Sequence, residues 1–84
     1  MGKRWSIDED LIVCRFYLKN KTNKKPNFLE LFEIFRKRGL DRSLTTIKDR
    51  FYNYQYIDIG KGLSHASKQQ RYVFELLTKN DTKI

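Results

Sequence analysis

The side chains best suited to chemistry stand on one face of a helix that we expect from about Leu44 to Tyr54. Helical spacing puts four polar residues on the outer face of this helix, namely Thr45, Lys48, Asp49 and Tyr52. Together they offer a cationic donor, an anionic acceptor and two hydroxyl groups that both donate and accept hydrogen bonds. This is the chemistry of recognition through hydrogen bonds and charge.

The rest of the chain offers no residue set suited to catalysis or metal binding. Cys14 is the one cysteine and His65 the one histidine, whereas a zinc site needs several such ligands. A glycine-rich phosphate loop, a pair of acids in a pocket and a nucleophile beside a base are all missing from the pattern. We therefore expect a non-enzyme without metal, cofactor or small-molecule substrate. Cys14 is expected to be a buried thiol and His65 a surface or capping residue.

Composition and charge narrow the class of partner. The 84 residues suit a single domain over 1–84, with a formal net charge of +8. Such a charge attracts polyanions, either nucleic acid or an anionic membrane surface. An aromatic content of 14% argues against a disordered basic tail. No membrane span, signal peptide or basic amphipathic helix with a free apolar face is apparent, so an intracellular location without membrane contact is expected.

Capping signals predict four helices, over about residues 7–18, 28–38, 44–54 and 65–78. Ser6 and Glu9 form a capping box at the start of the first. Asn27 is expected to cap the second helix, which ends at Gly39. Ser43 caps the third, and Ser64 or Ser67 caps the fourth. Residues 54–59 carry a weak strand signal. Apolar spacing assigns core positions to Phe28, Leu31, Phe32 and Phe35 in the second helix and to Leu44, Ile47 and Phe51 in the third.

Two segments resemble a Myb/SANT-type domain. Trp5-Ser6 followed by Ile7-Asp8-Glu9-Asp10 is similar to its opening of Trp, Ser or Thr, and an acidic cluster. Arg42-Ser43 and the run from Ile47 to Asn53 resemble its third helix. Within that run, residues 48–51 are close to the lysine-aspartate-basic-tryptophan signature of telomere-repeat-binding Myb domains, with Phe in place of Trp. The resemblance covers roughly residues 5–54. It implies an all-α, homeodomain-like helix-turn-helix of three helices, to which the fourth helix is an addition.

The resemblance implies sequence-specific binding of double-stranded DNA, with the third helix in the major groove. The base contacts would then be Thr45, Lys48, Asp49 and Tyr52. Lys48 can donate to guanine O6 and N7, and Asp49 can accept from the cytosine N4 amino group. This pair suits a G·C-containing repeat such as telomeric DNA, and hence a nuclear, chromosomal location. A plain surface role for Asp49 is the alternative.

Other basic residues are expected to hold the DNA backbone, or to form a solvated face. The candidate backbone contacts are Lys3, Arg4, Lys24, Lys25, Lys37, Arg38, Arg42 and Ser43. Arg50 is expected to form a salt bridge with Glu9 or Asp10, with a DNA contact as the alternative, and Trp5 is assigned to the core. The resemblance also implies core positions at Val13, Cys14 and Tyr17, with Phe16 nearby. Lys68 and Arg71 leave open whether the fourth helix also touches DNA.

The first and fourth helices carry more apolar surface than a three-helix module needs. The surplus residues are Ile7, Leu11 and Leu18 in the first helix and Tyr72, Val73, Leu76 and Leu77 in the fourth. The fourth helix can fold back on the first within a monomer, or the two helices can build a homodimer contact. The two arrangements are not exclusive, because Phe74 is still left on another side.

A protein-interaction function competes with DNA binding. SANT-type domains resemble Myb domains yet often bind proteins, so this chain is alternatively an interaction or homodimerisation module of a chromatin or telomere protein. Their third helices tend to be less basic. Residues 36–54 hold six basic and two acidic side chains here, which favours DNA.

Overall fold

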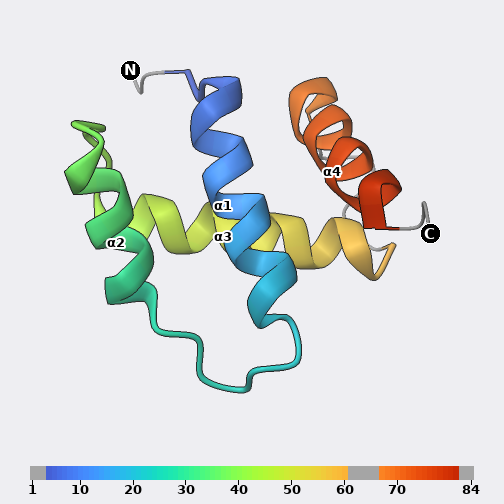
Figure 1. Ribbon diagram of the computed structural model, residues 1–84, viewed down its shortest axis with the longest axis horizontal. Coiled ribbons are helices and arrows are strands. Elements are labelled where there is room, and N and C mark those ends of the chain that lie inside the picture. Colours follow the sequence, from blue (N-terminus) through green and yellow to red (C-terminus); the bar gives the residue numbers. More distant parts are fainter. Residues whose placement is uncertain (1–3, 61–66, 82–84) are drawn as a thin grey trace.

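The computed structural model describes residues 4–60 and 67–81. In these ranges the chain forms four α-helices and no strand. They are α1 (Ile7–Asn20), α2 (Phe28–Lys37), α3 (Leu44–Asp58) and α4 (Lys68–Asp81). The predicted all-α class is confirmed. In Figure 1, α1 crosses in front of α3, with α2 on one side of α1 and α4 on the other.

Aromatic side chains join α1, α2 and α3 in the core. Phe51 of α3 meets three rings edge-on, with centroid distances of 4.9 Å to Phe28, 5.4 Å to Tyr17 and 6.0 Å to Phe16. Such edge-to-face contacts add to the apolar area that the rings bury. The core predictions hold for the buried residues Val13, Cys14, Phe16, Tyr17, Leu31, Phe35, Ile47 and Phe51. Phe28, Phe32 and Leu44 are half-buried.

Side-chain caps fix three of the helix starts. Ser6 Oγ accepts from the Glu9 N–H at 3.1 Å, and Glu9 accepts from the Ser6 N–H at 2.9 Å, as predicted. Ser43 Oγ accepts from the Thr46 N–H at 3.2 Å. Ser67 and Gln70 form a second reciprocal box, at 3.1 and 3.2 Å. The prediction for Asn27 is wrong, because its side chain makes no capping hydrogen bond.

Glycines end two helices. Gly39 follows α2 and Gly60 follows α3, with φ of 72° and 79°. This left-handed conformation costs a residue with a Cβ far more than it costs glycine. For α2 the stop was predicted from the sequence.

The third helix is one turn longer than predicted. It continues to Asp58, so both the predicted end at Tyr54 and the strand signal over 54–59 are wrong. Tertiary contacts account for the extra turn. Tyr54 and Ile57 are buried, and the Tyr17 hydroxyl donates to Asp58 Oδ2 at 2.7 Å. Lys21 Nζ also lies 3.6 Å from that oxygen.

The fourth helix folds back on α1 within the chain, as the first of the two arrangements predicts. Its first residue is Lys68, because Ser67 is the cap; Ser64 and His65 lie outside the described residues. Val73 is fully buried, and Phe74 and Leu77 pack against the core. Phe74 is therefore not left over.

The buried face of α4 differs in part from the predicted one, which consisted of Tyr72, Val73, Leu76 and Leu77. Gln70, which the cap draws inward, is only 3% exposed and stands on the inner face with Val73, Phe74 and Leu77. Tyr72 and Leu76 turn outward and are 56% and 39% exposed. On α1, Leu11 and Leu18 pack against the core as expected, whereas Ile7 stays exposed.

Candidate nucleic-acid interface

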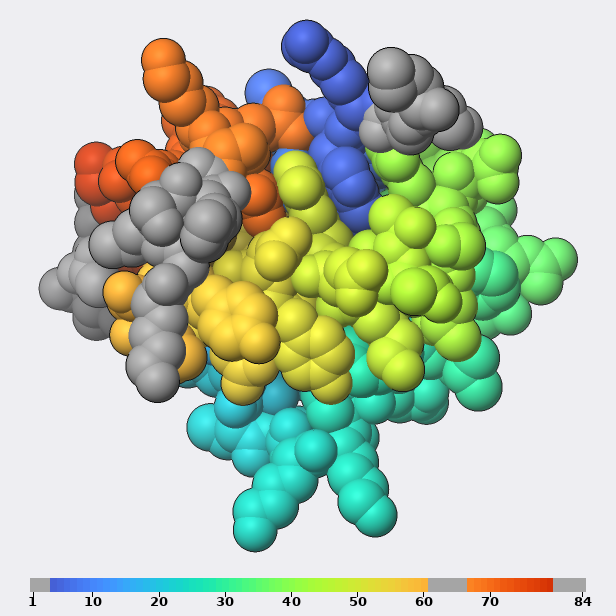
Figure 2. Space-filling view, turned by 180° about the vertical axis from the view of Figure 1, so that it is seen from behind, coloured from blue at the N-terminus to red at the C-terminus, as the bar shows by residue number. Residues whose placement is uncertain are grey.

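The outer face of α3 is the surface that the sequence nominated for recognition. Thr45, Lys48, Asp49 and Tyr52 are all exposed. The opposite face supplies Ile47, Phe51, Tyr54 and Ile57 to the core. In Figure 2, the yellow and yellow-green atoms of α3 run across the surface of the molecule. The four proposed reading residues therefore lie together on an accessible helix face.

Phe28 supports two of these residues from α2. Its ring centroid lies 5.4 Å from Lys48 Nζ and 5.8 Å from the Tyr52 ring. A cation above an aromatic face is attracted by the ring quadrupole. Lys48 stays exposed in this position, and no described residue forms an ion pair with it or with Asp49. Both charges are thus available to an external partner.

Two arginines of the same region turn inward instead. Arg42 Nε donates to Glu9 Oε2 at 2.7 Å, and Arg50 Nε donates to Asp10 Oδ1 at 2.7 Å. Second N–H groups complete both pairs, at 3.0 and 2.9 Å. Two parallel hydrogen bonds make each pair bidentate, the strongest geometry for a guanidinium and a carboxylate. The predicted salt bridge of Arg50 is confirmed, with Asp10 as the partner.

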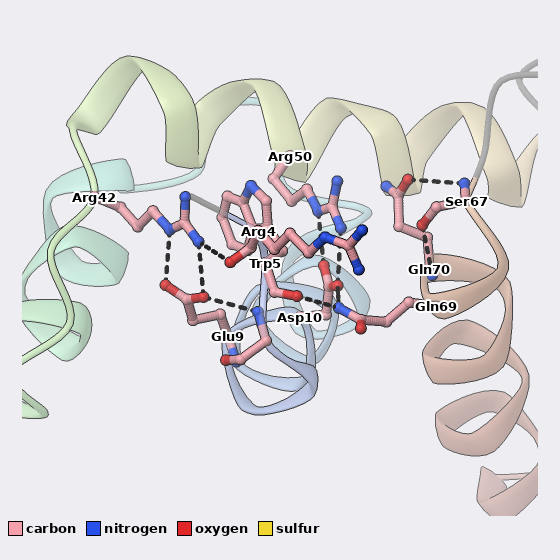
Figure 3. Close-up of polar contacts among 10 residues, drawn as sticks. Arg4, Trp5, Glu9, Asp10, Arg42, Arg50, Ser67, Gln69 and Gln70 are labelled. Carbon is pink, nitrogen blue, oxygen red and sulfur yellow. Dashed lines mark hydrogen bonds and ion pairs between the residues drawn. The ribbon is translucent and has the colours of Figure 1, made fainter. Parts of the chain in front are cut away.

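Trp5 lies between these two ion pairs (Figure 3). The guanidinium carbons of Arg42 and Arg50 stand 4.6 and 4.7 Å from its ring centroid. Gln69 of α4 donates to the Trp5 carbonyl at 2.7 Å and to Asp10 Oδ2 at 2.6 Å. This cluster, here called the Trp5 cluster, joins the start of α1 to α3 and α4.

The Trp5 cluster changes the expectation for Arg42. Its side chain is 8% exposed, and its Nη2 also donates to the Arg4 carbonyl at 2.6 Å. We therefore withdraw Arg42 as a phosphate contact, since the fold uses its hydrogen-bond donors. The Arg42 hydrogen bond is also the main reason that the pKa of Glu9 is lowered.

The remaining predicted backbone contacts lie on several elements, and Arg38 lines a surface to which α3 contributes no residue. Arg4, Lys24, Lys25, Lys37 and Arg38 are exposed, and Lys3 lies outside the described residues. Ser43 is exposed, but its hydroxyl donates to Thr46 Oγ1 at 2.9 Å while it caps α3. The lysine-rich loop between α1 and α2 (residues 21–27) lies against α3, because Lys21 and Lys24 line a hollow of about 230 Å³ together with Tyr52 and Gln55.

The extra turn of α3 adds exposed residues that sequence reasoning missed. Gln55 and Tyr56 are exposed along the helix, and Ile59 follows it with 56% exposure. A signal for them was present, because Tyr54 and Ile57 continue the apolar spacing of Ile47 and Phe51 up to Gly60.

The described residues bring no set of metal ligands together, and their one cysteine is buried. No cluster of three or more His, Cys, Asp or Glu side chains in ranges 4–60 and 67–81 is arranged to hold a metal ion. Cys14 is buried as predicted, and burial raises the pKa of its thiol to about 12. A thiol with that pKa is almost entirely protonated at neutral pH and is a poor nucleophile. No helix in the described part of the chain has the length and apolar character of a membrane span.

Comparisons with known proteins give no relative from which to transfer a function. No family model, no curated protein and no solved structure matches this chain.

Proposed function

We propose that this chain is a DNA-binding module that reads double-stranded DNA with the outer face of α3. The observation that carries the proposal is the division of α3 into two faces. Its inner face is committed to the core, while Thr45, Lys48, Asp49 and Tyr52 project from an accessible surface. The major groove of B-DNA is wide enough to admit one α-helix with such side chains.

In this proposal, α2 and α3 form the helix-turn-helix of a homeodomain-like module, and α3 is its recognition helix. Lys48 donates to guanine O6 and N7, and Asp49 accepts from the cytosine N4 amino group. Thr45 and Tyr52 contact bases on either side. A carboxylate next to phosphates is unfavourable unless it gains such a partner, so Asp49 favours a specific G·C-containing site. Telomeric repeats are one candidate, and they imply a nuclear protein.

The charge of the chain supports the proposal. Both ion pairs of the Trp5 cluster are neutral, so the net charge of +8 is carried by the rest of the molecule. Arg4, Lys24, Lys25 and Lys37 are exposed and are the proposed phosphate contacts, whereas Arg38 lines a surface to which α3 contributes no residue. With four such contacts, the logarithm of the binding constant should fall against log salt with a slope of about −3.6 on duplex DNA.

A salt-dependent titration tests the proposal. The full chain is titrated into a labelled telomeric duplex and into a scrambled duplex of equal composition, from about 50 to 200 mM salt. We expect tighter binding to the telomeric duplex than to the scrambled duplex, and a steep salt dependence of binding to both. Asp49→Asn should reduce the preference between the duplexes more than it reduces total affinity. Equal affinity for the two duplexes would contradict the proposed telomeric specificity. No binding near 150 mM salt would contradict the proposal of DNA binding.

One observation favours a second function, protein interaction through the same surface. Tyr52, Tyr56 and Ile59 are 40%, 50% and 56% exposed at the C-terminal half of α3. Tyrosines are enriched at protein interfaces. Arg42 and Arg50 no longer add positive charge to this surface. Absence of DNA binding, together with loss of partner binding in Tyr56→Ala, would favour this alternative.

A further inference from the structure

A second surface lies on the side of α1 that α3 does not cover. An open groove of about 720 Å³ is lined by side chains from α1, α2 and α4, together with Arg38 directly after α2, and by none from α3. Its apolar lining consists of Ile12, Phe16, Leu18, Ile34 and Leu77. Its charged residues are Arg15, Lys19, Arg38 and Glu30. We call this surface the α1–α2 groove.

The cations of the α1–α2 groove are unpaired. Arg15, Lys19 and Arg38 are exposed, and none of them forms an ion pair with any residue that the structure describes. Arg15 and Lys19 are four residues apart on α1 and therefore share one side of the helix. This differs from Arg42 and Arg50, which the fold has neutralised. The groove thus combines an apolar floor with excess positive charge.

We propose that the α1–α2 groove binds an amphipathic helix of a partner protein, with an apolar stripe flanked by Glu or Asp. Helices are commonly recognised in this way, with apolar anchors in a groove and charges at its edge. The apolar stripe would cover Ile34 and Leu77, and the acidic flank would pair with Arg15, Lys19 and Arg38. The phosphate backbone of DNA offers no apolar counterpart to the floor.

A second copy of this chain fits the groove less well. Two copies each carry a net charge of +8 and repel one another. The chain has one run of acidic residues, Asp8 to Asp10, and its Glu9 and Asp10 carboxylates are buried in the Trp5 cluster. Charge complementarity therefore favours a different, acidic protein.

A designed peptide tests the proposal directly. The probe is a fluorescein-labelled helical peptide of about five turns, with leucines at i, i+3, i+4 and i+7 and glutamates beside them. Two further peptides have the same composition in scrambled order, or lysines in place of the glutamates. In fluorescence anisotropy with the full chain, we expect the acidic amphipathic peptide to bind at least about tenfold tighter than either control.

Matched variants locate the binding. Arg15→Gln with Lys19→Gln should weaken peptide binding about tenfold, whereas Lys25→Gln with Lys37→Gln removes the same charge outside the groove and should change it less than about twofold. Ile34→Ser should also weaken peptide binding, because it removes apolar lining from the groove. Leu29→Ser changes an exposed residue of α2 outside the groove and should leave peptide binding unchanged. Circular dichroism confirms that each variant is folded.

Three results would overturn the proposal: equal affinity for all three peptides, equal effects of the two charge pairs, or self-association that Ile34→Ser abolishes. The last result would give the groove to a second copy. A duplex titration keeps the two proposals separate, since Lys25→Gln with Lys37→Gln should weaken DNA binding more than Arg15→Gln with Lys19→Gln. Failure of the peptide to bind would leave that DNA result unaffected.

Discussion

Lys48 and Arg50 are two basic residues in the same turn of α3, and the molecule uses them in opposite ways. Arg50 points to α1, where its side chain is 15% exposed and forms a bidentate pair with the buried Asp10. Lys48 points outward, with its ammonium group near the Phe28 ring and free for an external partner. A positive charge on a presumed recognition helix is therefore no measure of binding by itself. Its partner inside the fold decides whether it stabilises the protein or remains available.

The largest effect should come from the inner face. Asp10→Ala leaves the Arg50 guanidinium and the Gln69 amide without their shared acceptor. Removing one member of a buried ion pair costs about 3–5 kcal/mol, because the other charge stays buried without compensation. Chemical denaturation should show a loss of this size. Asp8→Ala, on an exposed residue of the same turn, is the control, and an equal loss in both variants would contradict a structural role for the pair.

Glu9 should contribute less, and its contribution should depend on pH. Glu9→Gln is expected to lower the free energy of unfolding by about 2 kcal/mol at pH 7, since hydrogen bonds to charged groups are worth about 1.5–3 kcal/mol. The folded-state pKa of Glu9 is lowered, chiefly by the Arg42 hydrogen bond. Its stabilisation is therefore present above the unfolded-state pKa and is lost as the pH falls through the folded-state pKa.

Denaturation at several pH values from about 7 to 2.5 checks this sign, around the ordinary glutamate pKa. The difference between the wild-type chain and Glu9→Gln should shrink as the pH falls. The exposed Glu30→Gln variant should show no comparable difference at any pH. If the difference in the free energy of unfolding grew as the pH fell, the charge of Glu9 would not be what stabilises the fold.

On the outer face, Lys48→Ala should reduce the affinity for a specific duplex by about 1–3 kcal/mol and leave stability unchanged. The lysine contacts no buried acceptor, so the fold loses only its exposed contact with the Phe28 ring, which is worth at most about 1 kcal/mol and keeps the expected change in stability small. Lys19→Ala removes the same charge from α1 and is the control for general attraction to phosphate. Binding measured at fixed salt should separate the two. Equal losses would mean that α3 does not read bases.

The smallest effects concern the helix starts. Ser43→Ala should cost about 1 kcal/mol, the usual value of a side-chain cap. Asn27→Ala should cost almost nothing, because its side chain makes no capping hydrogen bond. Thermal denaturation of the two variants compares them at equivalent positions. A larger decrease in the melting temperature for Asn27→Ala than for Ser43→Ala would contradict the assignment of a side-chain cap to α3 and none to α2.

Local signals in the sequence predicted much of the fold. The Ser6–Glu9 box, the Ser43 cap and the stop at Gly39 depend on residues within four positions of one another, and all three are present in the structure. The exposed positions of Thr45, Lys48, Asp49 and Tyr52 also follow from helical spacing, which the helix geometry guarantees. Their use in DNA binding stays a prediction.

Contacts between distant residues were beyond such signals. Arg42 meets Glu9 across 33 positions in the chain, and Tyr17 meets Asp58 across 41. Because of the first pair, Arg42 is no longer a candidate phosphate contact. The second pair helps to extend α3 by a turn. Local signals also failed to predict the buried face of α4. Gln70, which takes part in the cap, is buried there, whereas Tyr72 and Leu76 are exposed.

The amino-acid order therefore determined where α1, α2 and α3 begin, which side of α3 is polar and the excess of positive charge, because these depend on near neighbours and on composition. Packing gave Arg42 and Arg50 their carboxylate partners, left the cations of the α1–α2 groove without an ion pair among the described residues, and set the length of α3. The physical reason is that a charge or an apolar side chain takes its energy from what lies within a few ångströms in space. In this chain those neighbours come from other helices.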